Sequence, residues 1–136
     1  MNILLILNDG PYGTERSYNG LRLAIALAKT EGTEVRVFLM ADAVACAKPG
    51  QTTPEGFYNI GRMLKGLTSR GVVVGACGTC LDARGYSDAD LADGVHRSSM
   101  AELAAWTLEA EWGGLEPGED LASRRGDRAD LRIGPA

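Results

Sequence analysis

One closely spaced cysteine pair, in the segment Cys77-Gly78-Thr79-Cys80, is the strongest indication of chemistry in this sequence. The thiolate form of cysteine attacks electrophilic sulfur, and the unpaired N–H groups at the start of a helix stabilise a thiolate. We therefore predict that Cys77 is an ionised and reachable nucleophile. The alternative is a buried structural cysteine, because free cysteine is among the most buried residue types.

Cys80 follows Cys77 by three positions, so the two sulfur atoms approach each other if a helix begins between them. In that arrangement Cys80 resolves an oxidised or persulfidated Cys77. The alternative is that Cys80 is a small apolar side chain on the inner face of the helix. A single C-x-x-C segment indicates thiol chemistry but does not specify the reaction.

A polar loop, Asn8-Asp9-Gly10-Pro11-Tyr12-Gly13-Thr14, follows the first apolar run. It has the position of a phosphate-binding loop but contains neither G-x-G-x-x-G nor G-x-x-x-x-G-K-S/T, so we do not expect a nucleotide site. A turn in which Thr14 caps the next helix is favoured over ligand contact. Asn8, Asp9 and Tyr12 are the loop's candidates for substrate contact.

Basic side chains offer a way to attract an anionic sulfur species to Cys77. Arg84, Arg97 and Lys48 are candidates for drawing in a persulfide or a sulfite-like group, although an exposed surface position is the default for each. The loop, the cysteine segment, Cys46 and two of these cations give the candidate substrate-binding residues: Asn8, Asp9, Tyr12, Cys46, Lys48, Gly78, Thr79 and Arg84.

A zinc site is the other use that the cysteines suggest. Cys46, Cys77, Cys80 and His96 together have the composition of a Cys₃His tetrahedron. Only one C-x-x-C is present, however, and Cys46 and His96 stand on separate connections without ligand-pair spacing. A single loop histidine is usually solvated, so we expect no metal and no cofactor.

The composition limits the partners. The chain has 136 residues, 45% hydrophobic and 24% charged, which is typical of one globular domain. A net charge of -4 argues against nucleic acid or an anionic membrane as the main partner. The odd count of 3 cysteines and the lack of a signal-peptide pattern predict a cytoplasmic protein with reduced thiols. No apolar run approaches the roughly 20 residues of a membrane span.

Apolar runs alternate with helical patterns, which predicts an α/β fold. The run at 3–7 is continuous, as in a central parallel strand that is buried on both faces. Thr53-Pro54-Glu55 has the order of an N-cap, an N1 proline and a first-turn acid. The expected elements are strands over 35–40 and 72–76, helices over 14–31 and 54–70, a helical segment from Cys77 to Arg84, and a long connection over 41–53 that forms a wall of the site.

Two capping boxes follow. Ser87 with Asp90 predicts a short helix that ends at Gly94, and Ser99 with Glu102 predicts a last helix over about 100–111. We therefore expect one domain over 1–112 and a polar tail with Gly and Pro over 113–136, in which the only strand-like fragment is 131–133.

Four blocks of the sequence carry a resemblance to a known family. They are Asn8-Asp9-Gly10-Pro11-Tyr12-Gly13-Thr14-Glu15-Arg16, Phe38-Leu39-Met40-Ala41-Asp42-Ala43-Val44, Cys46-Ala47-Lys48-Pro49-Gly50-Gln51 and Cys77-Gly78-Thr79-Cys80-Leu81-Asp82-Ala83-Arg84-Gly85. In this order they resemble the DsrE/DsrF-like (YchN-like) sulfur-relay family, over about residues 1 to 110.

The resemblance implies a three-layer α/β/α domain with a mainly parallel sheet, cytoplasmic, and assembled as a homotrimer or homohexamer. Members of the sulfur-relay branch carry persulfide on a cysteine that follows a strand and precedes a glycine by eight residues, and Cys77 and Gly85 match that spacing. The chain departs from the family after Trp106, where an apolar fifth strand normally follows. Either the sheet keeps four strands or fewer, with 131–133 as a substitute, or the tail results from an altered reading frame.

Three functions remain open. The first is a sulfurtransferase-like carrier in which Cys77 takes sulfane sulfur and passes it to a partner thiol. The second is a thiol–disulfide or redox-sensing protein that uses Cys77 with Cys80. The third is a non-catalytic oligomeric binding or regulatory module in which the thiols are incidental.

Overall fold

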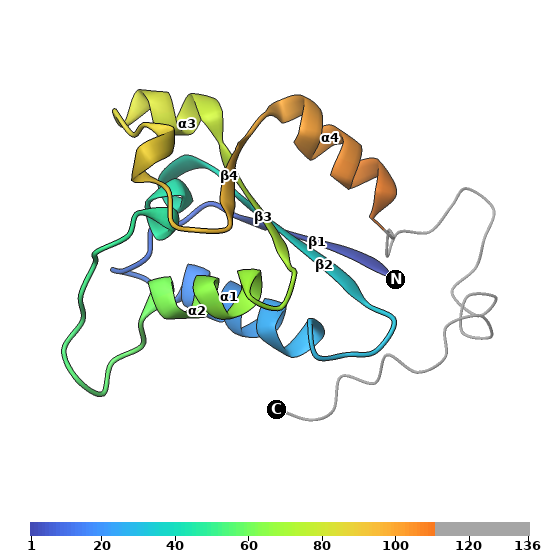
Figure 1. The fold of residues 1–136 in the computed structure, drawn as a ribbon, viewed down its shortest axis with the longest axis horizontal. Coiled ribbons are helices and arrows are strands. Elements are labelled where there is room, and N and C mark those ends of the chain that lie inside the picture. The colour runs from blue at the N-terminus through green and yellow to red at the C-terminus, as the bar shows by residue number, and fades with distance from the viewer. Residues whose placement is uncertain (111–136) are drawn as a thin grey trace.

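The computed structural model describes residues 1–110, which form a three-layer α/β/α domain around a parallel sheet (Figure 1). The predicted fold class is confirmed. The sheet order is β1-β2-β3-β4. Its elements are β1 (Asn2–Leu7), α1 (Arg16–Leu27), β2 (Glu34–Leu39), the 3-10 helix η1 (Ala41–Ala47), α2 (Ile60–Thr68), β3 (Val73–Cys77), α3 (Gly78–Ala83), the 3-10 helix η2 (Asp88–Asp90), β4 (Val95–Ser98) and α4 (Met100–Glu109).

Helices cover both faces of the sheet. In Figure 1, α1 and α2 lie on one face, and α3 and α4 lie on the other. Close packing on the first face depends on Gly20 of α1, where a Cβ atom would come within 2.5 Å of Leu7 Cδ2. On the other face Trp106 of α4 meets Phe38 of β2 edge-to-face, with ring centroids 6.1 Å apart.

β1 lies at an edge of the sheet, so the prediction of a central strand was wrong. Ile6 is 43% exposed, and Ile3, Leu4 and Leu5 are only half-buried. A continuous apolar run indicates that both faces of a strand are covered, but it does not say by what. The run therefore leaves apolar surface along β1 that the described residues do not cover.

β4 was not predicted. Its sequence, Val95-His96-Arg97-Ser98, contains one apolar residue, as befits a short strand at the other edge of the sheet. The capping box of Ser87 and Asp90 is present, but it begins only the 3-10 helix η2 instead of a helix reaching Gly94.

Helix starts differ from the sequence predictions at two places. α2 begins at Ile60, where the Asn59 side chain accepts a hydrogen bond from Arg62 N at 3.0 Å, and not at Pro54. Gly56, with φ +85°, interrupts the segment that Thr53 was expected to cap. α1 begins at Arg16 after Glu15, without a cap from Thr14, and ends at Leu27 instead of continuing to 31.

The last described helix begins as predicted. The Ser99 side chain accepts a hydrogen bond from Glu102 N at 3.2 Å, so Ser99 caps α4. α4 ends at Glu109, two positions before the expected 111. The predicted tail over 113–136, with its fragment 131–133, lies outside the described residues.

Candidate functional site

The two thiols lie at the junction of β3 and α3. β3 ends at Cys77, and α3 begins at the next residue, Gly78. This junction is at the carboxyl edge of the parallel sheet, where α/β proteins place their ligand sites. Gly78 lets the junction pack against β4, because a Cβ atom there would lie 3.0 Å from the backbone oxygen of Ser98. The predicted position of the thiols in the fold is therefore confirmed.

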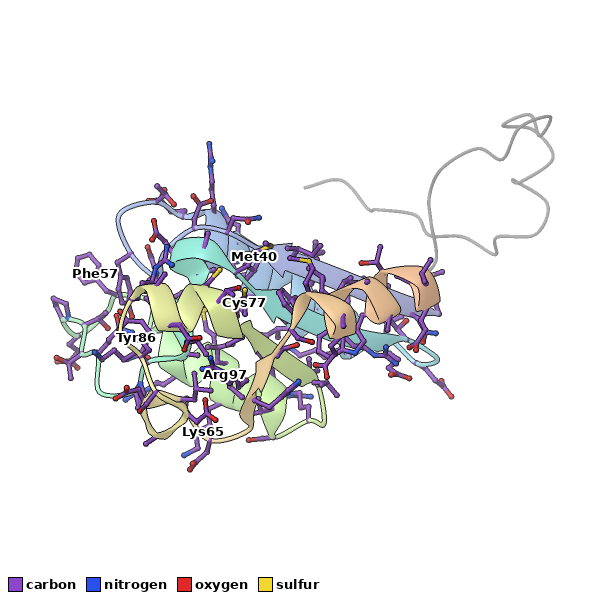
Figure 2. The ribbon with its side chains drawn as sticks, turned by 90° about the horizontal axis from the view of Figure 1, so that it is seen from above. Met40, Phe57, Lys65, Cys77, Tyr86 and Arg97 are labelled. Carbon is purple, nitrogen blue, oxygen red and sulfur yellow. The ribbon has the colours of Figure 1, made fainter. Side chains whose placement is uncertain are left out.

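Cys77 is buried, with 3% of its surface exposed, and this differs from the expectation of a reachable thiol. It pairs in register with Ser98 of β4, the strand that the sequence did not reveal. Figure 2 places Cys77 in the interior, at the same end of the sheet as Met40, which follows β2. The structure thus gives Cys77 the burial that the structural alternative predicted.

The surroundings of Cys77 still favour its thiolate. Burial is the largest influence and raises the pKa of Cys77, but hydrogen bonding by Thr79 and Cys80 outweighs it and leaves the pKa below its ordinary value. The Thr79 hydroxyl lies 3.3 Å from Cys77 Sγ. The backbone N–H groups of Thr79 and Cys80 add to this effect, although neither has the geometry of a capping hydrogen bond.

Cys80 is more exposed than Cys77 and has a different partner. It is half-buried, and its sulfur accepts a hydrogen bond from Ala41 N at 3.1 Å. Ala41 has φ 51°, a left-handed conformation that is uncommon for a residue with a side chain. Burial is the largest cause that raises the pKa of Cys80, and the neighbouring Cys77 raises it further. The hydrogen bond from Ala41 N–H lowers the pKa but does not offset these two causes. Of the two thiols, Cys77 is therefore the more readily ionised and Cys80 the more accessible.

Arg84 is the candidate cation that acts on the Cys80 thiol. Arg84 binds the Cys80 carbonyl oxygen at 3.1 Å and Asp42 at 2.7 Å, and its charge lowers the pKa of the Cys80 thiol. Arg97 is engaged instead by Asp82 at 2.6 Å and by Asp88 at 3.4 Å.

Cys46 is remote from this chemistry. It is 1% exposed, and burial raises the pKa of its thiol to about 11. Its sulfur donates a weak hydrogen bond to the Asp9 carbonyl oxygen at 3.8 Å. Cys46 is therefore a protonated thiol that ties η1 to the loop after β1.

Several of the other candidate residues line two surface pockets. Neither pocket is lined by Cys77 or Cys80. A pocket of about 580 Å³ is lined by Asp9, Tyr12 and Arg84 among others. A second pocket, of about 530 Å³, is lined by Cys46 and Lys48 together with residues of α2 and of the segment before β4. Asn8 is exposed and lines neither of the two.

Tyr12 also has a structural role. Its hydroxyl accepts a hydrogen bond from Ile60 N at 3.2 Å, at the start of α2. Its ring stacks on Tyr58 at a centroid distance of 5.7 Å. These contacts hold the loop after β1 against the beginning of α2.

The sequence profile of the DsrE/DsrF-like family matches residues 1–111. The chain belongs to the DsrE/DsrF-like family. It is 48% identical to the protein YchN of Escherichia coli over 110 residues, which is 80% of this chain and 93% of that one. An uncharacterized protein of Methanopyrus kandleri is 38% identical over 109 residues, covering 80% of this chain and 88% of its own length.

Solved structures agree with this membership. The crystal structure of YchN from Escherichia coli superimposes with a TM-score of 0.77 and covers 81% of this chain and 94% of its own. A protein of unknown function from Methanobacterium thermoautotrophicum, 19% identical, has a TM-score of 0.63 over 79% of this chain and 92% of its own, and shares the fold. Membership of the DsrE/DsrF-like family supports a function of the sulfur-relay kind.

One polar cluster of this DsrE/DsrF-like chain was missed by sequence reasoning. His96 lies in β4, not in a loop, and its Nε2 bonds Glu102 while its ring meets Trp106 at 6.0 Å. Ser98 Oγ donates to the same Glu102 carboxylate at 2.8 Å. Burial raises the pKa of Glu102, but the bonds from His96 and Ser98 prevail and hold it below its usual range. The sequence signalled Glu102 only as part of a helix cap.

Two further findings concern residues 1–110. No group of three or more His, Cys, Asp or Glu side chains there is placed to hold a metal ion. Within the same residues, no helix has the length and apolar character needed to cross a membrane.

Proposed function

We propose that this protein accepts sulfane sulfur as a persulfide on Cys77 and passes it to a thiol of a partner protein. The observation that carries the proposal is the lowered pKa of Cys77 at the junction of β3 and α3, with the second thiol of Cys80 beside it. Family membership supports the same kind of chemistry.

The transfer consists of two balanced displacements. The Cys77 thiolate attacks the outer sulfur of a donor persulfide, the S–S bond of the donor breaks, and the donor leaves as a thiolate. The new Cys77 persulfide then reacts with a partner thiolate at its outer sulfur, which restores the Cys77 thiolate. No external oxidant or reductant is required. The Thr79 hydroxyl, 3.3 Å from Cys77 Sγ, stabilises the anionic sulfur before and after transfer.

The burial of Cys77 gives this proposal a structural requirement. Cys77 is only 3% exposed, so a donor sulfur must pass the side chains that cover it. Cys80 is half-buried, and Met40 lies at the same end of the sheet (Figure 2). We propose that small displacements of such side chains, when donor or acceptor docks, admit the incoming sulfur.

Further copies of the chain are the proposed partners along β1. Ile6 of that strand is 43% exposed, and Met100 at the start of α4 is 59% exposed. Apolar side chains on an edge strand are commonly covered in an assembly. The exposed edge favours an assembly of copies, and we propose the cytoplasmic homotrimer or homohexamer that the family resemblance implies.

Intact-mass measurement tests the sulfur proposal. After incubation with a sulfane-sulfur donor and removal of the excess, each persulfide adds about 32 Da, the mass of one sulfur atom carried on a thiol. We expect this gain in the wild type and in Cys46→Ser, which serves as the matched control, and no gain in Cys77→Ser. Uptake that persists in Cys77→Ser would assign the sulfur to another residue.

A thiol–disulfide function is the second candidate, because Cys77 and Cys80 influence each other's ionisation directly. It requires a two-electron oxidant and forms an intramolecular disulfide without sulfur gain. Loss of two hydrogens in the intact mass, together with no persulfide, would favour this function.

A binding module with incidental thiols is the third candidate, and the 3% exposure of Cys77 favours it. Under this alternative both thiols of the C-x-x-C segment remain unmodified by a small alkylating agent at neutral pH.

A further inference from the structure

We propose that the pocket of about 530 Å³ between η1, α2 and the segment before β4 is a binding site for a small dianion. We call it the cationic pocket, defined by Lys48, Arg62 and Lys65 with Asp93 as its lining carboxylate. The site is separate from the C-x-x-C thiols, which do not line it. The inference therefore goes beyond the proposed sulfur transfer.

The charges of the cationic pocket are unbalanced. Lys48, Arg62 and Lys65 contribute three positive charges and Asp93 one negative charge, which leaves two positive charges in a chain whose net charge is -4. Arg62 and Lys65 are three positions apart on α2, so they share a helix face. A dianion would neutralise this excess.

The three cations of the pocket have no carboxylate partner within 4.0 Å among residues 1–110. In contrast, the guanidinium groups of Arg36 and Arg97 are each paired with two carboxylates. The Lys48 ammonium lies 4.7 Å from the centre of the Tyr86 ring, and it also lowers the pKa of Asp90.

Asp90 does not neutralise the pocket. Its carboxylate accepts hydrogen bonds from the backbone N–H and the hydroxyl of Ser87, at 2.7 and 3.0 Å, and it is not among the residues that line the pocket. The carboxylate of Asp90 is thus used in the cap of η2. Lys48, which lines the pocket, therefore remains available to a ligand bound there.

Hydrogen bonds from side chains to the backbone hold the walls of the cationic pocket in place. Gln51 Nε2 donates to the carbonyl oxygens of Ala45 at 2.7 Å and Lys48 at 2.9 Å, which closes the connection after η1 into a fixed turn. Asn59 fixes the start of α2 on the opposite side. The pocket is therefore formed before a ligand arrives, which lowers the entropic cost of binding.

The lining also indicates the size and character of the ligand. Pro49 and Leu91 contribute apolar surface to the lining. The volume falls within the range of about 300–1,000 Å³ that is typical of small-molecule sites. These features fit a small molecule with two acidic oxygens or one doubly charged oxyanion group, such as a dicarboxylate or a phosphate monoester.

Isothermal titration calorimetry of the full chain tests the proposal with three probes: succinate, inorganic phosphate and sulfate. Sodium chloride keeps the ionic strength constant, at a slightly alkaline pH where each probe is predominantly a dianion. We expect saturable binding of at least one probe at one site per chain. The double variant Arg62→Gln/Lys65→Gln should weaken that binding about tenfold or more. Succinate binding indicates a carboxylate ligand, whereas phosphate or sulfate binding indicates an oxyanion ligand.

The matched control is Lys29→Gln/Arg70→Gln, which removes the same charge from two exposed residues outside the pocket. We expect this variant to bind like the wild type. Absence of saturable binding for all three probes, or equal weakening in both double variants, would overturn the proposal. Sulfur uptake by Cys77 is measured separately, and its failure would leave a positive titration unaffected.

Discussion

At the residue scale, ionisation and access are divided between the two thiols. Cys77 is the residue whose pKa is lowered, yet it is buried, whereas Cys80 is half-buried and has a raised pKa. The spacing of the C-x-x-C segment predicted that the sulfurs would be neighbours at a helix start. It could not predict the burial of Cys77, because the strand that pairs with it there, at Ser98, lies more than 20 residues later in the chain.

The pH dependence of thiol alkylation tests the ionisation of Cys77. In a Cys46→Ser/Cys80→Ser background, in which the introduced serine hydroxyl keeps a hydrogen-bond donor at position 80, the rate should reach half its maximum below the ordinary thiol pKa of about 8.5. Thr79→Val should move that midpoint to higher pH, because the hydroxyl at 3.3 Å no longer stabilises the thiolate. Thr14→Val, at an exposed position far from the thiols in the sequence, should leave the midpoint in place. A midpoint that Thr79→Val leaves unchanged would contradict the role assigned to the hydroxyl.

The contribution of Glu102 to stability also depends on pH. Because its pKa is lowered in the folded state, its stabilising contribution is complete above the pKa of about 4.3 in the unfolded chain and is lost as pH falls through the folded-state value. Glu102→Gln should lower the free energy of unfolding at neutral pH by about 1 kcal/mol, a figure reduced for solvent screening at this partly exposed side chain. Urea unfolding across the acid range should show this difference shrinking. Exposed Glu31→Gln is the control, and a difference that stays constant with pH would contradict the linkage.

At the element scale, the junction of β3 and α3 depends on a residue without a side chain. Gly78→Ala would place a Cβ atom 3.0 Å from Ser98 O, a backbone atom that cannot rotate away. We expect a loss of about 1–3 kcal/mol in the free energy of unfolding, as for other overpacking substitutions.

Gly66→Ala is the matched control for that substitution. Gly66 lies inside α2, and nothing stands within 4 Å of a Cβ atom built there. Replacement by alanine should stabilise the protein by up to about 1 kcal/mol through helix propensity. If chemical denaturation gave both variants the same stability, close packing at Gly78 would not be the cause.

Local signals account for the elements that were predicted and for those that were missed. Ser99 gave the start of α4 because its N-cap hydrogen bond, accepted from Glu102 N, is a contact within four residues. The Glu102 carboxylate bonds His96 and Ser98 and does not complete the predicted capping box. Thr53-Pro54-Glu55 carried a similar signal, yet Gly56 takes a left-handed conformation and the helix begins at Ile60. β4 has too few apolar residues to be recognised, since its place depends on β3 beside it.

At the scale of the whole molecule, the apolar edge of the sheet is the feature that residues 1–110 leave unexplained. The sequence run at 3–7 predicted full burial, and these residues cover β1 only in part. Coverage by further copies would reconcile the two, and the family resemblance implied such an assembly.

Light scattering tests that assembly. We expect a mass of three or six chains for the wild type and a smaller mass for Ile6→Lys, because a charge on the edge strand opposes pairing. Leu23→Lys changes an exposed apolar residue of α1, 50% exposed, and should keep the wild-type mass. A wild-type monomer, or an Ile6→Lys variant of unchanged mass, would contradict the proposed role of β1.

The most direct test of the account is to locate the added sulfur after reaction with a sulfane-sulfur donor. Trypsin leaves Cys77 and Cys80 in one peptide, because no Lys or Arg lies between Arg70 and Arg84, whereas Cys46 falls in another. Peptide mapping of the Cys80→Ser variant therefore distinguishes Cys77 from Cys46. We expect a gain of about 32 Da, one persulfide sulfur, on the peptide with Cys77 alone. A gain confined to the peptide with Cys46, or no gain on either, would contradict it.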